Sequence, residues 1–564
     1  MRSLLPLLLA SAAVRGAAER IELPAPVISI TEHLPKPLAQ RIALGYGSLA
    51  LLKRAARGSP PPLRSVLGGR EESTLVAEAP PNGVAIFCRA VALLLIFLPV
   101  LLTAPLAWLI RPFRAHVWFW LIKSSLARAG TAFIKWGQWA SVRPDMFPER
   151  LCAALAELHS RAPVHGFAHT RREVEESLGA PLEEVFYRFD EKPVASGSIA
   201  QVHRADIDGK LVAVKVRHPR VVERIVTDFT LMRMIADSSA KISWLSWLNL
   251  KQSVEQFSGT MVAQTRLDIE GEHLNRFNWN FGTAAWRDCA FPKVITPGGV
   301  PPSRAVLVET FEPGELVSKY TVEQTLGLQG AASLDPENAH FIVSRGEDTY
   351  LKMLLVDNLM HADLHPGNIL LDAPSRKSRR IVLLDVGMVA RLTTAEAEAF
   401  IGLLHAVGAG SGRAAAKAVL RFSNKQEVCV GKEKTKAFAD DMHELFLERC
   451  KGYGTGVQFG EVLRGVLNLV RRHRVALDAN YMTLVMNVLC LEGMAGALLP
   501  DYNVLDAARP LLATHRRLPR PLFKMALPLV CRLKRIRDGV WAAKSHKRKP
   551  SEDETPTAEA LGEA

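Results

Sequence analysis

The spacing of apolar residues divides most of the chain into helical stretches and shorter runs that alternate between apolar and polar positions. Residues 115–190 carry apolar side chains three or four positions apart, which predicts helices. The next runs, SIAQVHRADI and KLVAVKVRH, alternate with a period of two and are joined by Asp208-Gly209, which predicts a β-hairpin. A helical region at 221–281 and a strand at 304–311 follow. The remainder is again helical, apart from one strand in RRIVLLDVG.

One stretch near the N-terminus is a long run of uncharged, mostly apolar residues. The segment Ala90–Ile110 has 21 residues without a charge and is flanked by Arg89 and Arg111. A helix of about 20 apolar residues can cross the hydrocarbon core of a bilayer. We therefore predict a transmembrane helix over residues 90–110. The alternative is an apolar helix that packs on the folded domain and is bent at Pro99 and Pro105.

The first 85 residues have the composition of a targeting sequence and a linker. Two arginines and no acidic residue precede Glu19, together with serines and small residues, which is typical of a mitochondrial presequence. The core LLPLLLASAA would also fit a short secretory signal. Residues 21–85 are rich in Pro, Gly and Arg and predict a poorly ordered arm.

Composition and charge narrow the class of protein. A chain of 564 residues with 48% hydrophobic residues is long and apolar enough to fold into several domains. Its net charge of +14 is concentrated partly in residues 516–549, where basic, aromatic and apolar residues alternate. This tail favours an anionic membrane surface over nucleic acid as partner. The seven cysteines form no CxxC pair, so neither a zinc ribbon nor a disulfide framework is predicted.

The sequence HADLHPGN admits two interpretations. A metal site could use His361, Asp363 and His365, but the remaining histidines form no second cluster of ligands. Phosphoryl transfer needs an Asp that accepts a hydroxyl proton, an Asn five positions later for Mg²⁺, and a strand-borne Asp-x-Gly for a second metal contact. Asp363, Asn368 and Asp385 have that order and spacing, so we expect them to serve phosphoryl transfer.

Two upstream segments complete a site for ATP. The strand VAVK places Lys215 where a lysine can contact the phosphates of ATP. The preceding loop carries small residues whose backbone N–H groups can approach phosphate. These candidate ATP-binding residues are Ala195, Ser196, Gly197 and Ser198. Residues 361–363 read HAD where conventional protein kinases have HRD, and no APE segment follows Asp385. A conventional protein kinase switched by phosphorylation is therefore not expected.

The set KWGQ, VASGSIAQVH, VAVKV, LDIEGEHLNRF, HADLHPGNILL and LLDVG resembles the UbiB/ABC1 family of atypical kinases, the aarF-domain-containing proteins. The resemblance covers roughly residues 115–505, and the C-terminal part is most similar to a mitochondrial branch of the family. It implies an α+β, bilobal protein-kinase-like fold with an N-terminal KxGQ helical extension and a preceding transmembrane helix. The domains expected are residues 1–85 (targeting and linker), 90–110 (transmembrane helix), 115–190 (extension), 191–312 (N-lobe), 313–520 (C-lobe) and 521–564 (basic tail).

The resemblance also implies roles for residues outside the phosphate site. Glu272 matches the helix glutamate that pairs with the strand lysine, here Lys215. Lys135 and Gln138 of the extension would lie over the nucleotide. The family usually has Glu-x-Asp opposite the extension, whereas this chain has Arg-Leu-Asp, so Asp268 is the carboxylate left to pair with Lys135. The family's AAAS loop is replaced by ASGS, so nucleotide preference is not predicted.

The function implied is an ATPase or phosphotransferase that supports coenzyme Q biosynthesis or mitochondrial lipid metabolism. Its cofactors would be ATP and Mg²⁺. Its partners would be membrane lipids, such as cardiolipin or a quinone precursor, and coenzyme Q biosynthetic proteins, with no nucleic acid. We expect a single-pass protein of the mitochondrial inner membrane. A protein kinase that acts in trans and a pseudokinase scaffold that binds nucleotide without turnover remain alternatives.

Overall fold

The structure, a computed structural model, describes a large part of the chain. The described residues are 60–63, 82–141, 147–156, 158, 164–239, 250–325, 334–375, 378–423, 426 and 428–546. The predicted targeting sequence and most of the predicted linker lie outside these residues. The chain divides into two compact units, of which residues 59–506 form the larger.

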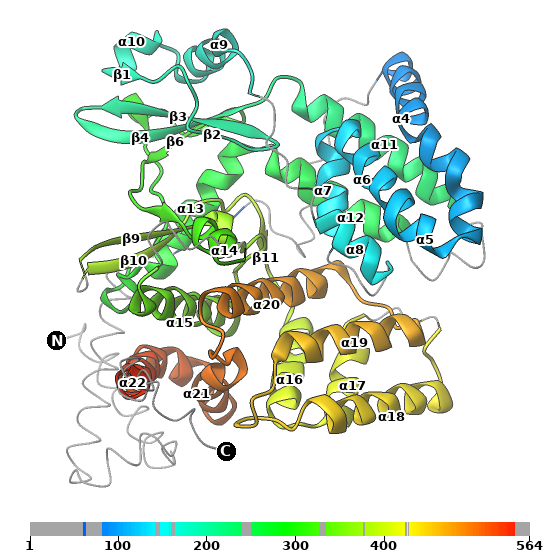
Figure 1. Cartoon of the computed structure of the whole chain (residues 1–564). Helices are drawn as coiled ribbons and strands as arrows, with labels where there is room; N and C mark the ends of the chain where they lie inside the picture. The colour runs from blue at the N-terminus through cyan, green and yellow to red at the C-terminus, as the bar shows by residue number, and fades with distance from the viewer. Residues whose placement is uncertain are drawn as a thin grey trace, which may run out of the picture. The chain divides into compact units, whose positions relative to one another are not determined.

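The first half of the larger unit contains an antiparallel sheet (Figure 1). Its strands pair in the order β1 (Arg188–Phe189), β3 (Ala200–Ile207), β4 (Lys210–Arg217) and β6 (Val306–Thr310), and β2 (Ala195–Ser196) pairs with β3. The predicted hairpin is confirmed: β3 and β4 are joined by Asp208 and Gly209, whose φ angles are 52° and 73°. Positive φ at both positions matches the twist of the two strands.

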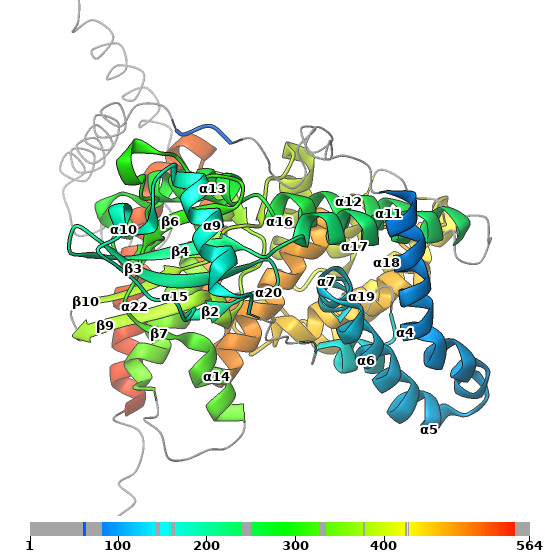
Figure 2. The same ribbon diagram turned by 90° about the horizontal axis from the view of Figure 1, so that it is seen from above.

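Three helices occupy the predicted helical region at 221–281. They are α11 (Val221–Ser239), α12 (Leu250–Gln264) and α13 (Leu267–Phe281). Figure 2 shows α11 and α12 side by side, with α4 near one end of α11. Because α13 packs on β6, its residues are positioned against the sheet that carries Lys215.

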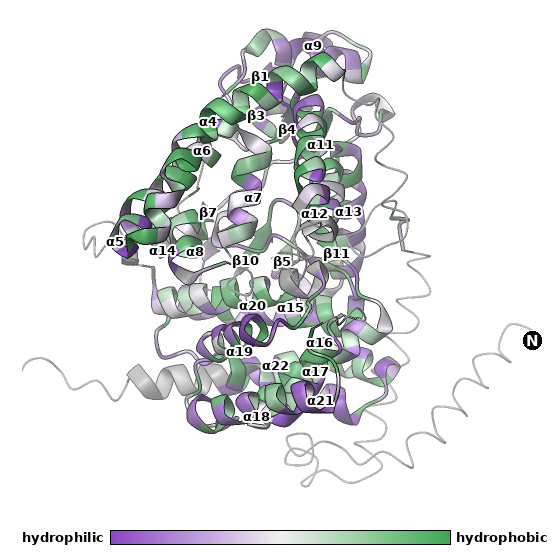
Figure 3. Cartoon of the chain, turned by 90° about the vertical axis from the view of Figure 1, so that its right-hand side faces the viewer, coloured by the Kyte–Doolittle hydropathy of each residue, from purple (hydrophilic) through white to green (hydrophobic). Residues whose placement is uncertain are grey.

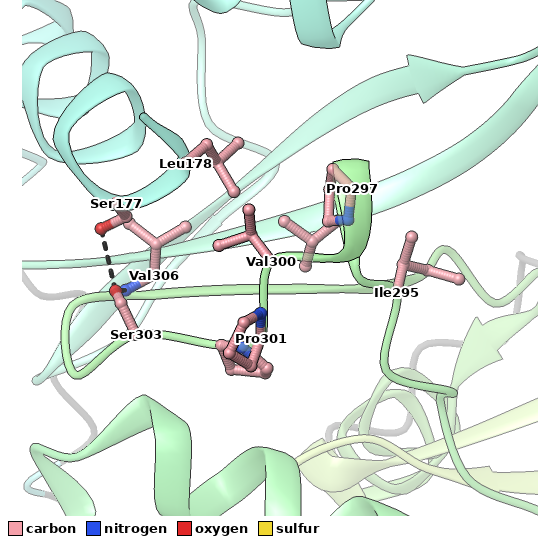
Figure 4. A pocket seen from close by; sticks show the side chains of 10 residues that line it. Ser177, Leu178, Ile295, Pro297, Val300, Pro301, Ser303 and Val306 are labelled. Carbon is pink, nitrogen blue, oxygen red and sulfur yellow. Dashed lines mark hydrogen bonds between the residues drawn. The ribbon is translucent and has the colours of Figure 1, made fainter. Parts of the chain in front are cut away.

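A proline-rich loop, residues 297–302, lies against α13. Figure 4 shows this loop under the last turn of α9 (Phe167–Leu178), where the hydroxyls of Ser177 and Ser303 lie 2.8 Å apart. A Cβ atom on Gly271 of α13 would lie 3.0 Å from Cγ of Pro302 and 3.5 Å from Leu307. Glycine therefore permits the close approach of α13 to the loop at the position next to Glu270.

A second sheet and a helical region form the rest of the larger unit. The strands pair in the order β5 (Cys289–Ala290), β10 (Ser378–Leu383), β9 (Ile369–Ser375) and β7 (Glu315–Leu316), and β8 (Met360–His361) pairs with β11 (Val389–Ala390). The surrounding helices are α14 (Val317–Thr325), α15 (Pro336–Lys352), α16 (Thr394–Gly408), α17 (Gly412–Leu420), α18 (Lys432–Arg449), α19 (Phe459–His473) and α20 (Ala479–Leu498). The HADLHPGN segment thus runs from β8 to β9, and Asp385 lies between β10 and β11.

The segment before the first sheet is helical, as its periodicity predicts. Its main helices are α4 (Gly83–Leu109), α6 (Phe119–Ala129), α7 (Thr131–Ser141) and α8 (Glu149–Ala156); α5 (Arg111–Phe113) and a π-helical turn, η2 (Arg114–Trp118), connect α4 to α6, and α10 (Leu182–Val185) follows α9. Within the part of the chain that the structure describes, α4 is the one helix long and apolar enough to cross a membrane. Its mean hydropathy is 2.7 in the most apolar window, and Figure 3 shows its hydrophobic colouring.

The second unit includes residues 507–546, the end of α21 (Val504–Arg517) and the helix α22 (Arg520–His546). The rings of His515 and Phe523 pack edge to face at 4.9 Å and join the two helices. Most of the predicted basic tail is therefore helical up to residue 546.

Candidate active site

Lys215 lies on β4 at the centre of a group of carboxylates. Its Nζ atom is 2.6 Å from Oε1 of Glu270 on α13, 3.1 Å from Oε1 of Glu309 on β6, and donates to the carbonyl of Leu384 at 3.3 Å. Lys215 pairs with Leu307 across the β4–β6 ladder, so Glu309, two positions further on, projects from the same face of the sheet.

The predicted partner of Lys215, Glu272, is not the residue that the structure places there. Residues two positions apart on a helix point roughly 200° apart. Glu270 is 6% exposed and faces Lys215, whereas Glu272 is on another side of α13 and is half-buried. The buried residues of α13 include Leu267, Glu270, Leu274, Phe277 and Phe281, which are spaced three or four positions apart. That three-and-four spacing could have identified Glu270 from the sequence.

Charge around Lys215 is unbalanced. Burial would lower the pKa of Lys215, but the negative charges of Glu270, Glu309 and Asp385 outweigh it and raise this pKa. Burial raises the pKa of Glu309 to about 7 and also raises that of Glu270. The Oε2 atom of Glu309 has no hydrogen-bond partner. Three carboxylates therefore share one ammonium group, a charge excess that a divalent cation would offset.

The other predicted catalytic residues lie on two loops joined by backbone bonds. The side-chain amide of Asn368 donates to the carbonyl of Asp363 at 3.0 Å, and the N–H of Leu384 donates to the carbonyl of Asn368 at 3.0 Å. Asp385 follows Leu384, and its Oδ1 accepts from the N–H of Gly387 at 2.9 Å. Burial would raise the pKa of Asp385, but Lys215 and the Gly387 N–H hold it below its ordinary value. The loop of Asn368 is thus bonded to the segment that precedes Asp385, and the Leu384 carbonyl of that segment accepts from Lys215.

Both histidines of this loop bind backbone groups. Nδ1 of His361 accepts from the N–H of Asp363 at 3.1 Å, and Nδ1 of His365 accepts from the N–H of Gly367 at 3.0 Å. Among the described residues, no three His, Cys, Asp or Glu side chains are grouped to hold a metal by themselves. The Nδ1 atoms of both histidines thus hold the backbone of the loop.

Two buried residues that the sequence did not indicate position these loops. Asn487 of α20 donates to the carbonyl of His361 at 2.5 Å and accepts from the N–H of Leu364 at 3.4 Å. Nδ1 of His273 on α13 lies 2.8 Å from the carbonyl of Val386. A lone asparagine in the apolar run TLVMNVLCL was a signal for Asn487, because a buried amide needs polar partners.

The small-residue loop forms the turn between β2 and β3. The N–H of Gly197 donates to the carbonyl of Ala200 at 2.9 Å, and the carbonyl of Gly197 lies 2.9 Å from Nε2 of His218. The hydroxyl of Thr131, the first residue of α7, donates to the carbonyl of Ser198 at 3.4 Å. The loop containing Ala195, Ser196, Gly197 and Ser198 is thus joined to the helix that carries KWGQ.

Of the two predicted residues of the extension, Lys135 reaches the loop of Asp363 and Gln138 does not. Nζ of Lys135 lies 3.9 Å from Oδ2 of Asp363. Gln138 donates to the carbonyl of Leu158 at 2.6 Å, so it bonds within the extension and not over the nucleotide site. Asp268, expected to pair with Lys135, instead accepts two hydrogen bonds from its neighbour Arg266, at 2.7 and 2.8 Å. Arg266 thus binds the carboxylate of Asp268 that was expected to pair with Lys135.

A strand lysine bound to a helix glutamate, an Asp–Asn loop and a following Asp-x-Gly define the nucleotide site of protein-kinase-like proteins. The family described as ABC1 atypical kinase-like domain matches residues 157–418. A probable serine/threonine-protein kinase, abkC, of Dictyostelium discoideum is 31% identical over 80% of this chain and 71% of its own length. The chain belongs to the ABC1/UbiB family of atypical kinases.

More distant relatives carry the same family names. An ABC1 family mitochondrial protein of Saccharomyces cerevisiae is 27% identical over 74% of this chain and 72% of its own length. A probable protein kinase UbiB of Vibrio cholerae is 27% identical over 69% of each chain. The solved complex of Rv3197 with erythromycin from Mycobacterium tuberculosis covers 65% of this chain at 17% identity with a TM-score of 0.37, a likeness too weak to add to the assignment.

Proposed function

We propose that the protein is a Mg²⁺-dependent ATPase or phosphotransferase. The observation that carries the proposal is the arrangement of Lys215, held by Glu270 and Glu309 beside Asp385. A buried ammonium group at this place can bind the phosphates of ATP, and the surplus of carboxylates attracts a divalent ion.

The donor set fits magnesium. Mg²⁺ prefers oxygen ligands and is commonly held by one or two protein groups together with the phosphates of a nucleotide. The carboxylate of Asp385 and the amide oxygen of Asn368 are such ligands. When bound, the ion would neutralise charge on the phosphates. The unpartnered oxygen of Glu309 and the excess negative charge around Lys215 support this fit.

Each protein group then has one task. Lys215 would contact the phosphates, and Glu270 and Glu309 would keep it in position. The loop 195–198 would approach the phosphates through backbone N–H groups other than that of Gly197, which donates to Ala200. Asp363 would orient the acceptor hydroxyl, or a water, and accept its proton. Lys135, whose Nζ lies 3.9 Å from Oδ2 of Asp363, would lie beside the acceptor.

The names of the relatives support a proposal for the cellular role. Relatives of this chain are named UbiB kinases and mitochondrial ABC1 proteins. We propose a role in coenzyme Q biosynthesis or a related branch of lipid metabolism at the mitochondrial inner membrane. Its partners would be cardiolipin or a quinone precursor and coenzyme Q biosynthetic proteins, and no nucleic acid. A single-pass topology is what the length and hydropathy of α4 predict.

The test is ATP hydrolysis by the full chain with Mg²⁺, with and without vesicles that contain cardiolipin. We expect turnover that rises with vesicles and falls roughly hundredfold in Asp385→Asn. The matched control is Glu272→Gln, which changes a carboxylate outside the contacts of Lys215. Undiminished Mg²⁺-dependent nucleotide binding in Asp385→Asn would overturn the site.

The two alternative functions give different results in the same experiment. Nucleotide binding without turnover in either condition would favour a scaffold. Transfer of labelled γ-phosphate to a defined protein, lost in Asp363→Asn, would favour a kinase that acts in trans.

A further inference from the structure

The helix α4 is packed along its whole length on one side only. Its partly or fully buried positions recur every three or four residues, from Ile86 to Ala107. On this side, Ser125 donates to the carbonyl of Ile96 at 3.1 Å and the indole of Trp118 donates to the carbonyl of Val100 at 2.9 Å. The helix therefore lies against α6, η2 and α11 of the same unit.

The opposite side of α4 is both exposed and apolar. Phe87 is 68% exposed, Leu102 71% and Trp108 79%, and the exposed residues between them are also apolar. Trp120, at the start of α6, is 51% exposed. An exposed apolar surface that is continuous over a 27-residue helix marks an interaction site.

A buried ion pair holds α4 on the domain. The carboxylate of Asp228 on α11 is 2% exposed and accepts from Nε of Arg89 at 2.6 Å and from its NH2 group at 3.0 Å. Arg89 also donates to the carbonyl of Ala129 at the end of α6. Removal of Arg89 from this position would leave a buried carboxylate without its bidentate partner, which is strongly unfavourable.

This packing conflicts with a helix that crosses the bilayer. The helices beside α4 carry exposed charges: Glu223 and Arg224 on α11, and Arg128 on α6. Charged side chains at the depth of the hydrocarbon core are unfavourable. To cross, α4 would have to leave its partners and separate Arg89 from Asp228. As packed, it presents one apolar side, which suits a helix that lies in the plane of the membrane interface.

The charge around this side indicates which surface it binds. Apart from Arg89 and Lys135, which lie beside Asp228 and Asp363, residues 83–141 contain four Arg and Lys residues and no Asp or Glu. Arg111, which follows α4 directly, is exposed near Trp108 in the sequence. Basic residues attract anionic lipids, and tryptophan favours the level of the headgroups.

We infer that the exposed side of α4, together with Trp120, docks in the plane of an anionic lipid bilayer and does not cross it. The inference refines the membrane attachment in the proposed function and is independent of the nucleotide chemistry. It replaces the single-pass arrangement that length and hydropathy alone predict. The ion pair of Arg89 with Asp228 keeps α4 on the domain while its other side contacts lipid.

Topology is tested with cysteines at both ends of α4. Asn82→Cys and Pro112→Cys are combined in a Cys88→Ser, Cys490→Ser background, since Cys88 is exposed and Cys490 is partly exposed. The full chain is reconstituted in sealed vesicles of phosphatidylcholine and cardiolipin and labelled with a membrane-impermeant maleimide. In-plane binding leaves both cysteines of a molecule on the same side, so each molecule carries two labels or none. One label per molecule would show a crossing helix and overturn the inference.

Lipid binding is tested with matched leucine variants. Leu102→Glu places a charge on the exposed side of α4, and Leu211→Glu places one at a 50% exposed leucine on β4. We expect Leu102→Glu to lower flotation with cardiolipin-containing vesicles at least several-fold and Leu211→Glu to leave it unchanged. Wild-type flotation that is equal with and without cardiolipin would overturn the anionic specificity.

A loss of self-association in Leu102→Glu, with vesicle binding intact, would identify the surface as an interface between copies and overturn the inference. Neither measurement uses nucleotide. A failure of the ATPase proposal, seen in Asp385→Asn, therefore stays separate from a failure of the docking surface.

Discussion

The Nζ atom of Lys135 lies 3.9 Å from the Oδ2 atom of Asp363, although the two residues are on a helix before the first sheet and a loop of the second. Lys135 also contributes to the low pKa of Asp385. A helix that precedes the kinase-like domain in sequence therefore supplies a positive charge to the place where the acceptor and the metal would bind.

Lys135→Met removes this charge and keeps much of the side-chain volume. A cation near Asp363 and Asp385 repels Mg²⁺, so we expect the Mg²⁺ concentration for half-maximal activity to fall by roughly threefold to tenfold. The control is Lys210→Met, at the exposed start of β4. An unchanged or higher Mg²⁺ requirement in Lys135→Met would contradict the role of the contact.

Glu270→Gln and Glu272→Gln separate the two glutamates of α13. Glu270 forms the 2.6 Å ion pair with Lys215, and its loss frees the lysine to move toward Glu309 and Asp385. We expect kcat/KM for ATP to fall roughly tenfold or more in Glu270→Gln and to change less than about twofold in Glu272→Gln. The reverse order would restore Glu272 as the functional residue.

Glu309→Gln changes how stability depends on pH. Burial raises the pKa of Glu309 to about 7. Between the ordinary pKa of a glutamate and that value, Glu309 is therefore protonated in the folded chain and ionised in the unfolded chain. Wild-type stability therefore decreases as pH rises from the ordinary pKa of a glutamate to that value. We expect the Tm of the variant, relative to wild type and without nucleotide, to increase by roughly 2 °C or more from about pH 5 to about pH 8. A constant difference would show that the carboxylate does not titrate in this range.

Asn487→Ala tests a residue that positions the loop of Asp363. The change leaves the carbonyl of His361 and the N–H of Leu364 without their amide partner. We expect kcat to fall roughly tenfold while KM for ATP changes less than about twofold, because the contacts are on the acceptor side of the site. Asn275→Ala, at an exposed position of α13, is the control. A rise in KM for ATP without a fall in kcat would show that Asn487 affects nucleotide binding and would contradict this prediction.

Gly137→Val tests why the KWGQ segment needs its glycine. A Cβ atom there would lie 2.4 Å from Cδ1 of Leu158 and 3.3 Å from Cδ1 of Leu126, so a valine would push α7 away from these side chains. We expect a lower Tm together with the same fall in Mg²⁺ requirement as in Lys135→Met. Gly259→Ala on α12, where a Cβ atom would meet nothing within 4 Å, should leave the Mg²⁺ requirement unchanged and should not lower the Tm, because alanine favours a helix over glycine.

Local pattern predicted much of the fold. The hairpin at Asp208-Gly209 and the strand that contains Lys215 follow from alternation and turn chemistry, which act over a few residues. Glu270 was missed because family spacing was given more weight than the buried side of α13. Contacts between distant residues were beyond pattern: Asn487 meets a loop 126 residues before it, and Arg89 meets Asp228 across 139 residues. Only the packing of helices decides such pairs.

The surplus of carboxylates around Lys215 has a practical consequence for handling the protein. A folded state that carries more buried negative than positive charge gains stability from any divalent ion that binds there. Preparations treated with chelators should therefore melt earlier than those kept in magnesium. In a thermal-shift screen of candidate nucleotides, differences in the metal content of the buffers would therefore change the Tm. The metal content has to be held constant before the screen can show a preference for a base.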